Sequence, residues 1–197
     1  MKNKINELKQ LIQNNPNNTE AHFMLGFYYQ SLKQYPEAIS ALKEAIRLDP
    51  LNANSHALLG NCYNYLKQYS EAIKSLKESV RLDPKASGVY VVLGGCYHSL
   101  KKYSEALSSF KEAVHINPKD TYTQLSLGVY YHMLNYYSEA IKSLKESVRL
   151  DPKNERAHSF LVMTYLKMGN KRLALRQNKK LGKLNKNLAD TLSGLIL

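Results

Sequence analysis

Cysteine is scarce in this sequence, whose 197 residues include only Cys62 and Cys96. Two thiols are too few for the disulfide frameworks that hold small secreted domains together. Their separation equals the period of the repeat described below, which suggests equivalent positions on neighbouring helices. Helix axes that pack about 8–10 Å apart make a disulfide unfavourable, because its Cα separation must stay below roughly 7 Å. We therefore expect two free, largely packed thiols.

Long apolar runs are also missing. No stretch approaches the roughly 18 apolar residues that a helix needs to cross a bilayer. The first residues, MKNKINELKQ, include basic side chains but neither the apolar core nor the small-residue cleavage site of a secretory signal. We therefore expect a cytoplasmic protein. Its 44% hydrophobic and 22% charged residues are typical of a globular chain.

Acidic residues are outnumbered, since 16 Asp and Glu stand against 28 Lys and Arg. Much of the excess lies between residues 167 and 186, a stretch that contains eight basic residues and no acidic one. The rest of the chain holds 20 basic and 16 acidic residues, a net charge of +4 out of the total +12. We call the eight the basic patch: Lys167, Lys171, Arg172, Arg176, Lys179, Lys180, Lys183 and Lys186.

Against these absences stands an internal repeat with a period of 34. Four residue types recur at this step, which identifies a repeat architecture. The series are Pro16, Pro50, Pro84, Pro118, Pro152; Gly26, Gly60, Gly94, Gly128; Tyr29, Tyr63, Tyr97, Tyr131, Tyr165; and Ala38, Ala72, Ala106, Ala140, Ala174.

Each unit predicts two helices. In AHFMLGFYYQSL, Leu25, Tyr29 and Leu32 recur at helical spacing. A break follows at KQY, and the second helix begins at Pro36 or at its serine equivalents, residues suited to a helix start. The Asp-Pro or Asn-Pro that closes each unit ends this helix, because the residue before a proline avoids helical geometry.

This pattern resembles the tetratricopeptide repeat family. The motif is present as His22-x2-Leu25-Gly26-x2-Tyr29, followed by Ala38-x3-Leu42, Ala45 and Pro50. The resemblance implies an all-α, right-handed superhelical solenoid of helix-turn-helix repeats, with an N-terminal half-repeat helix and a C-terminal cap helix. The fifth unit departs from the motif, with Val162 in place of the glycine, Asn178 in the second helix and no closing proline.

The expected organisation follows from the period. It comprises a half-repeat helix at 1–18, four full units at 19–52, 53–86, 87–120 and 121–154, a degenerate fifth unit at 155–186 and a cap helix at 187–197.

One face of the first helices is unusually apolar. At 100° per residue, the positions three before, one after and four after the glycine point away from the core stripe, where an amphipathic helix would be polar. In the family that the chain resembles, this face lines the concave groove in which partner segments bind. The alternative is that curvature or a terminal helix buries part of it. The expected groove residues are Phe23, Phe27, Gln30, Asn61, Asn64, Tyr65, Val91, His98, Leu125, Val129, His132, Met133 and Met163.

The same face excludes one kind of partner. Some relatives bind the acidic C-termini of heat-shock chaperones through lysines, arginines and asparagines on these positions. None of the matching residues here is basic, and only Asn61 fits. They are Phe23, Phe27, Leu58, Gly88 and Val92 in one frame, and Ala57, Asn61, Val92, Tyr122 and Ser126 in the next. We expect instead a peptide or helix with apolar anchors, hydrogen-bonded by Asn61, Asn64 and Gln30.

Catalytic and metal chemistry find little support. The acids lie mostly on second helices and in turns, and no Ser–His–acid grouping or phosphate-binding glycine loop occurs. His98 and His132 share one slot on adjacent units, but no carboxylate is placed to complete a metal site. His22, His56 and His158 share another slot, where packing is the expected role. We expect no enzyme activity, no metal and no cofactor.

The leading hypothesis is therefore a non-catalytic interaction scaffold that binds a protein or peptide in its groove. The runner-up is self-assembly through the N-terminal half-repeat or the tail TLSGLIL. A third hypothesis is an adaptor that contacts nucleic acid or an anionic membrane surface through the basic patch. The alternative interpretation of the basic patch is a solvent-exposed face that aids solubility and has no partner.

Overall fold

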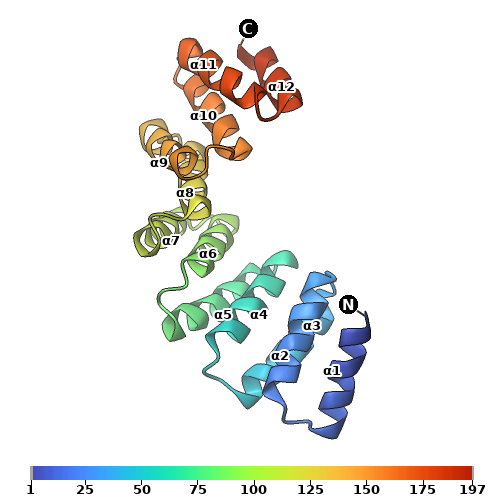
Figure 1. Ribbon diagram of the computed structural model, residues 1–197. Helices are drawn as coiled ribbons and strands as arrows, with labels where there is room; N and C mark the ends of the chain where they lie inside the picture. Colours follow the sequence, from blue (N-terminus) through green and yellow to red (C-terminus); the bar gives the residue numbers. More distant parts are fainter. Residues whose placement is uncertain (1, 197) are drawn as a thin grey trace. The chain divides into compact units, whose positions relative to one another are not determined.

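The computed structural model describes residues 2–196 and is entirely helical over that range, with twelve helices and no strand (Figure 1). Met1 and Leu197, at the ends of the expected half-repeat and cap helices, lie outside the described residues. The helices are α1 Lys2–Asn14, α2 Thr19–Ser31, α3 Tyr35–Leu48, α4 Ala53–Tyr65, α5 Tyr69–Leu82, α6 Ser87–Ser99, α7 Tyr103–Ile116, α8 Thr121–Met133, α9 Tyr137–Leu150, α10 Glu155–Lys167, α11 Lys171–Gly182 and α12 Lys186–Ile196.

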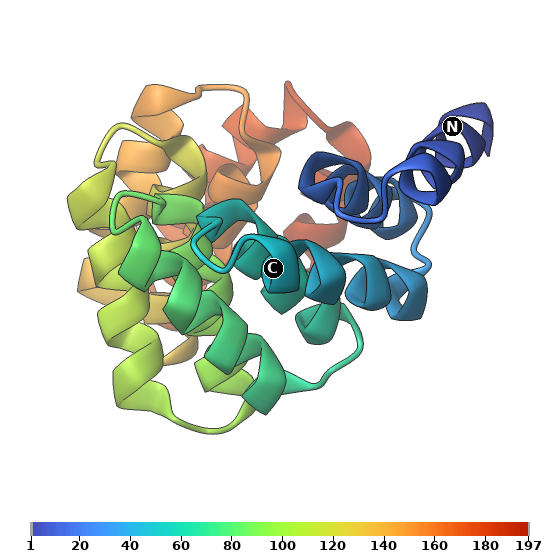
Figure 2. The ribbon, with the colours of Figure 1, turned by 90° about the horizontal axis from the view of Figure 1, so that it is seen from below.

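The chain divides into two compact units, with the boundary between Ser109 and Phe110 inside α7. In each unit, successive helices pack on their neighbours along the chain, as the coloured ribbons of Figures 1 and 2 show. From α2 to α10, the first helices begin at a constant step of 34 in the sequence. This packing of consecutive helix pairs confirms the all-α repeat class. The exact limits of the repeats stay a prediction.

A glycine–leucine contact joins the two helices in three of the pairs, α2–α3, α4–α5 and α8–α9. A Cβ built on Gly26 would lie 2.6 Å from Cγ of Leu42, and the same distance separates Gly60 from Leu76. In the second unit, the corresponding distance from Gly128 to Leu144 is 2.7 Å. These leucines are fully buried. The absence of a side chain on the glycine is therefore what allows the two helices to approach so closely.

The fifth pair of helices packs closely through a different combination of residues. Val162 takes the glycine position and is fully buried, while Asn178 takes the leucine position. The amide nitrogen of Asn178 donates to the carbonyl of Ala189 and to Oγ of Ser193, both at 2.9 Å. A larger residue opposite a smaller one restores the volume, and the amide holds α12 against α11. The departures from the motif thus have a structural role in seating the cap helix.

The turn inside each pair uses left-handed backbone geometry. Lys33, Lys67 and Lys101 have φ of 60° and Asn135 has φ of 63°. In the first turn, the Lys33 N–H donates to Gln30 O at 2.8 Å and the Gln34 N–H donates to Tyr29 O at 2.9 Å, which closes the helix end. A glycine, Gly169, stands at the equivalent position of the last pair, where it adopts φ of 71° without steric cost.

The shared histidine slot stabilises the turns between repeats. Nε2 of His22, His56 and His158 lies 2.9–3.1 Å from the carbonyl of the proline six residues earlier. Gln124 fills the slot in the fourth unit, and its Nε2 donates to Pro118 O at 3.0 Å. Burial of His158 and its contact with Gln177 add to this role. The histidines therefore have the expected packing role, with a hydrogen bond that sequence alone did not predict.

Both cysteines are free and fully buried, as expected. Burial raises the pKa of each thiol to about 11, so both are protonated at neutral pH. The Cys96 thiol donates to Oδ1 of Asn64 at 3.4 Å. Along residues 2–196, the helices are all too short or too polar to cross a membrane.

We predict that Gly60→Ala lowers the stability of the chain by about 1–3 kcal/mol, the usual range for overpacking a core. The added methyl would meet both Leu76 and the carbonyl of Ala72, which lies 3.2 Å away. Thermal and urea unfolding, followed by circular dichroism, measure the change. The matched control is Gly95→Ala, because nothing lies within 4 Å of its added Cβ. The control should keep or gain stability, since alanine favours a helix by up to about 1 kcal/mol. Equal losses in both variants would contradict the close-contact explanation.

Candidate functional site

The candidate site is the exposed side of the first helices, considered separately in each unit. These helices differ from the second helices in the distribution of their apolar residues. In α2, α4 and α8, apolar and polar residues are mixed around the helix, whereas α5 and α9 have distinct apolar and polar faces. A surface helix ordinarily turns its apolar residues towards the core. Several large apolar side chains of α2, α4 and α8 are exposed instead.

Two aromatic side chains dominate this surface in the first unit. Phe27 of α2 is 45% exposed, and its ring meets the ring of Tyr28 edge to face at 5.8 Å. Tyr65, at the end of α4, is 61% exposed and stacks on Tyr35 with 5.0 Å between ring centroids. Burial raises the pKa of Tyr35, and the neighbouring Tyr65 contributes. Flat aromatic surface of this kind is suited to binding an apolar anchor.

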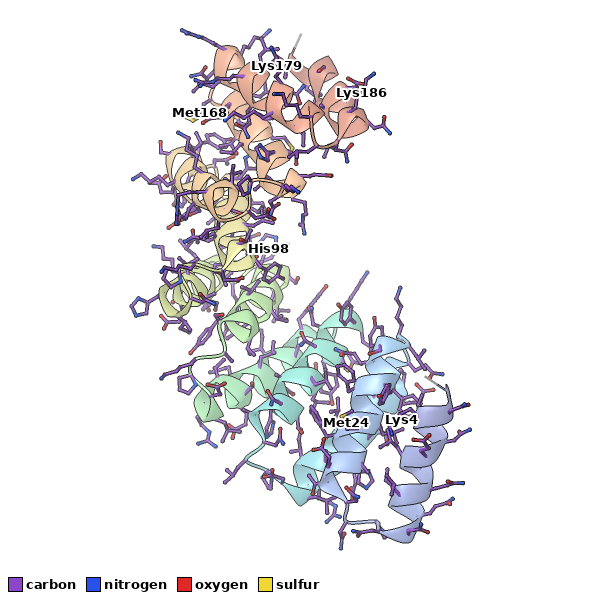
Figure 3. All side chains as sticks on the ribbon, viewed as in Figure 1. Lys4, Met24, His98, Met168, Lys179 and Lys186 are labelled. Carbon is purple, nitrogen blue, oxygen red and sulfur yellow. The ribbon has the colours of Figure 1, made fainter. Side chains whose placement is uncertain are left out.

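The polar residues of the same surface are half-buried. Asn64 accepts the hydrogen bond from Cys96, so its oxygen is occupied while its amide group remains a donor. Asn61 and Gln30 are also half-buried. The ring of His98, labelled in Figure 3, lies 5.7 Å from the ring of Tyr103.

Two of the expected groove residues are not accessible. Val91 and Leu125 are each only 5% exposed, and Leu125 belongs to the core of the second unit. Phe23 is half-buried and packs on the core formed by Ala38 and Leu42. The expectation that these side chains face a partner is therefore not met at Val91 and Leu125, because neighbouring helices cover them.

In the second unit, Met133 is the most exposed of the expected residues, at 50%. Val129 and Met163 are half-buried against the core. His132 is tightly surrounded: its Nδ1 lies 2.9 Å from Oγ1 of Thr164, and its ring meets those of Tyr137 and Phe160 at 5.8 Å. The Thr164 hydroxyl donates to Phe160 O at 2.6 Å, so it accepts from the His132 N–H. Here His132 links α8 to α10.

The first unit also has open cavities that the sequence did not predict. One of about 590 Å³ lies between α1, α2 and α3, where Lys9, Tyr29 and Glu37 contribute to its lining. A second, of about 400 Å³, has Lys77, Tyr97 and Glu105 at the equivalent positions, two periods further along the chain. The expected surface residues line neither cavity. The signal that could have predicted them is the period itself, because Lys9, Tyr29 and Glu37 recur two periods later as Lys77, Tyr97 and Glu105.

Within residues 2–196, no three His, Cys, Asp or Glu side chains are grouped so that they could hold a metal ion. His98 and His132 belong to different units and have the separate surroundings described above. All eight side chains of the basic patch are exposed.

The chain matches known families and structures over most of its length. Residues 1–79 and 44–113 match the family model described as anaphase-promoting complex, cyclosome, subunit 3, and residues 122–154 match a model described as tetratricopeptide repeat. No curated protein matches the sequence.

Among solved structures, YrrB, described as a tetratricopeptide repeat protein with an unusual peptide-binding site, is 21% identical, with a TM-score of 0.74 over 95% of this chain and 97% of that one. A thermophilic tetratricopeptide repeat protein of Thermus thermophilus is 25% identical, with a TM-score of 0.69 over 91% of this chain and 100% of that one. The pilF protein of Pseudomonas aeruginosa is 19% identical, with a TM-score of 0.79 over 95% of this chain and 86% of that one. These likenesses show a shared fold.

We predict that His132 makes the stability of the chain depend on pH. Burial, and secondarily the charge of Lys167, lowers the pKa of His132 in the folded chain. Below the unfolded pKa of about 6.5, the unfolded chain takes up a proton that the folded chain resists, so stability falls as the pH falls. Above that pH the histidine is neutral in both states and has no such effect.

Urea unfolding at pH 7.5 and 5.5 measures this loss. His132→Gln should lose less stability on acidification than the unchanged chain. The matched control, His115→Gln, replaces an exposed histidine and should leave the acid-dependent loss in place. An identical pH dependence in the chain and in His132→Gln would show that another group is responsible.

Proposed function

Because the chain belongs to the tetratricopeptide repeat family, whose fold serves protein–protein interaction, we propose that it is a non-catalytic scaffold for a peptide or helix with apolar anchors. The binding surface is the exposed side of the first helices. The observation that carries the proposal is the exposure of Phe27 and Tyr65 in the first unit and of Met133 in the second. Large apolar side chains left in water on neighbouring helices are typical of an interaction site.

The first unit supplies the better-defined part of this surface. Phe27 and the stacked pair of Tyr35 and Tyr65 offer aromatic contacts, and the amide of Asn64 offers a hydrogen-bond donor next to Tyr65 in the sequence. An occupant with apolar side chains and backbone carbonyls fits this combination. The absence of basic residues at the expected positions disfavours acidic chaperone tails as that occupant. The cytoplasmic location expected from the sequence stays a prediction.

The test compares Phe27→Ser/Tyr65→Ser with the unchanged chain for binding of a peptide selected by phage display on the unchanged chain. Each aromatic buried in a complex contributes roughly 1.5–3 kcal/mol, so we expect the affinity to fall at least tenfold. Isothermal titration calorimetry measures the affinity. Both side chains are exposed, so the melting temperature should change little.

The matched control is Leu11→Ser/Leu51→Ser, which removes two comparably exposed apolar side chains from outside the first-helix surface. The control should bind as the unchanged chain does. Binding that survives Phe27→Ser/Tyr65→Ser, or that falls equally in the control, would exclude this surface as the site.

Self-assembly remains the runner-up. The cap helix α12 buries Ala189, Leu192 and Ile196 within its own unit and leaves Leu195 66% exposed. A second chain could use that side chain, although one leucine offers little area. Sedimentation as a monomer at every concentration from micromolar to millimolar would rule this alternative out, whereas a dimer that Leu195→Ser dissociates would support it.

A further inference from the structure

The second helix of the last pair, α11, departs from the charge pattern of the other second helices. In α3, α5 and α9, a glutamate and an arginine three residues apart form an ion pair with an N–O distance of 2.6 Å. Each of these helices also has a glutamate in its first turn. At the equivalent positions, Lys180 of α11 and Lys183, the residue just after the helix, replace the pair, and Leu173 replaces the first-turn glutamate.

These changes work against the stability of α11 itself. Lys180 and Lys183 place like charges one turn apart, where α3, α5 and α9 gain an attraction, while the helix dipole favours the positive charge of Lys180 in the last turn. The first turn contains Arg172 and no acid, so a positive charge lies at the positive end of the helix dipole. A ligand of opposite charge would remove both penalties. The positive first turn and the like-charge pair are therefore features of α11 that an acidic partner would offset.

The basic side chains of α11 lie along one side of the helix at a regular spacing. Ala174, Gln177, Asn178 and Leu181 are buried against the rest of the unit. Arg172, Arg176 and Lys180 follow one another at intervals of four residues on the opposite, exposed side. That interval corresponds to about 6 Å along a helix axis. Aspartates or glutamates at the same interval on a second helix would match it.

An apolar side chain borders the charged stripe. Leu175 is 51% exposed and is the helical neighbour of Arg172 and Lys179, three residues before it and four after it. This combination favours a protein over the other anionic partners. Proteins that bind single-stranded nucleic acid without sequence preference add aromatic stacking to a positively charged groove, and α11 has no aromatic residue. Membrane insertion needs a free apolar face, and α11 buries its own.

We propose that the exposed face of α11, formed by Arg172, Leu175, Arg176, Lys179 and Lys180 and extended by Lys183 just after the helix, binds an acidic helical segment of another protein through charge complementarity and one apolar contact at Leu175. Lys179 of α11 is labelled in Figure 3, as is Lys186 at the start of α12. The site uses residues distinct from the first-helix surface, so the two proposals succeed or fail separately.

The probe is a fluorescein-labelled helical peptide with glutamates four residues apart and one leucine between them, and fluorescence anisotropy measures its binding. Arg176→Glu/Lys179→Glu should weaken binding more than tenfold. The matched control, Lys142→Glu/Lys145→Glu, reverses two exposed charges at the equivalent positions of α9. It should weaken binding less than threefold. Equal weakening by both variants would overturn the proposal in favour of general attraction to the net charge.

Two further comparisons fix the class of partner. Leu175→Ser should weaken peptide binding several-fold but leave its salt dependence unchanged, because the ionic contacts remain. If an oligothymidylate, or vesicles made of equal parts phosphatidylcholine and phosphatidylserine, bind more tightly than the peptide and Leu175→Ser has no effect, the proposal of a protein partner is wrong.

Phe27→Ser/Tyr65→Ser should bind the acidic peptide as the unchanged chain does, and loss of binding in that variant would contradict a separate site. Circular dichroism confirms that each variant keeps its helicity.

Discussion

The close contact between the glycine of a first helix and the leucine of the following second helix is the constraint on which the structure depends. A Cβ atom added to one of these glycines would lie only 2.6–2.7 Å from Cγ of the leucine. No side chain larger than hydrogen therefore fits opposite these leucines without movement. The contact brings two backbones together and thereby fixes which side of each helix is buried. The fifth pair of helices lacks this contact, because the larger Val162 replaces the glycine and Asn178 replaces the leucine. The side-chain amide of Asn178 donates hydrogen bonds to α12 and so holds that helix in place.

Identical sequences show how far this constraint reaches. YSEAIKSLKESVRLDPK occurs at 69–85 and again at 137–153. The two copies form α5 and α9, which bury the same four side chains at equivalent positions. Both also form the same glutamate–arginine pair at 2.6 Å. Because the two copies lie in different units and still pack alike, their surroundings are set by the repeat rather than by a ligand. Sequence identity between repeats therefore marks the scaffold.

The period made most of the fold predictable. Helix type and the pairing of helices follow from residues that recur at that step, and the free cysteines follow from the same spacing, whereas the cap helix was expected from the resemblance to tetratricopeptide repeat proteins. The burial of Val91 and Leu125 could not be predicted in this way, because a projection of one helix takes no account of the neighbouring helices on both sides. The proline carbonyl bonds of His22, His56 and His158 were also missed, since they depend on the path of a turn six residues away. The left-handed lysines of the turns were also missed, because their only sequence signal is indirect: Asn135 and Gly169 stand at the equivalent positions of later repeats.

The two proposed surfaces differ in the kind of departure that reveals them. On the first helices, the departure lies in exposure: the large aromatic side chains of Phe27 and Tyr65 are in water, on helices whose apolar residues are not confined to the buried face. On α11, it lies in charge: a stabilising ion pair present on three other second helices is replaced by two lysines. Exposed apolar area and unneutralised charge both carry a free-energy penalty in the isolated chain. The other repeats of the scaffold show how each penalty is ordinarily avoided. A partner that covered the exposed aromatic side chains or neutralised the lysines would therefore gain the most binding free energy at these positions.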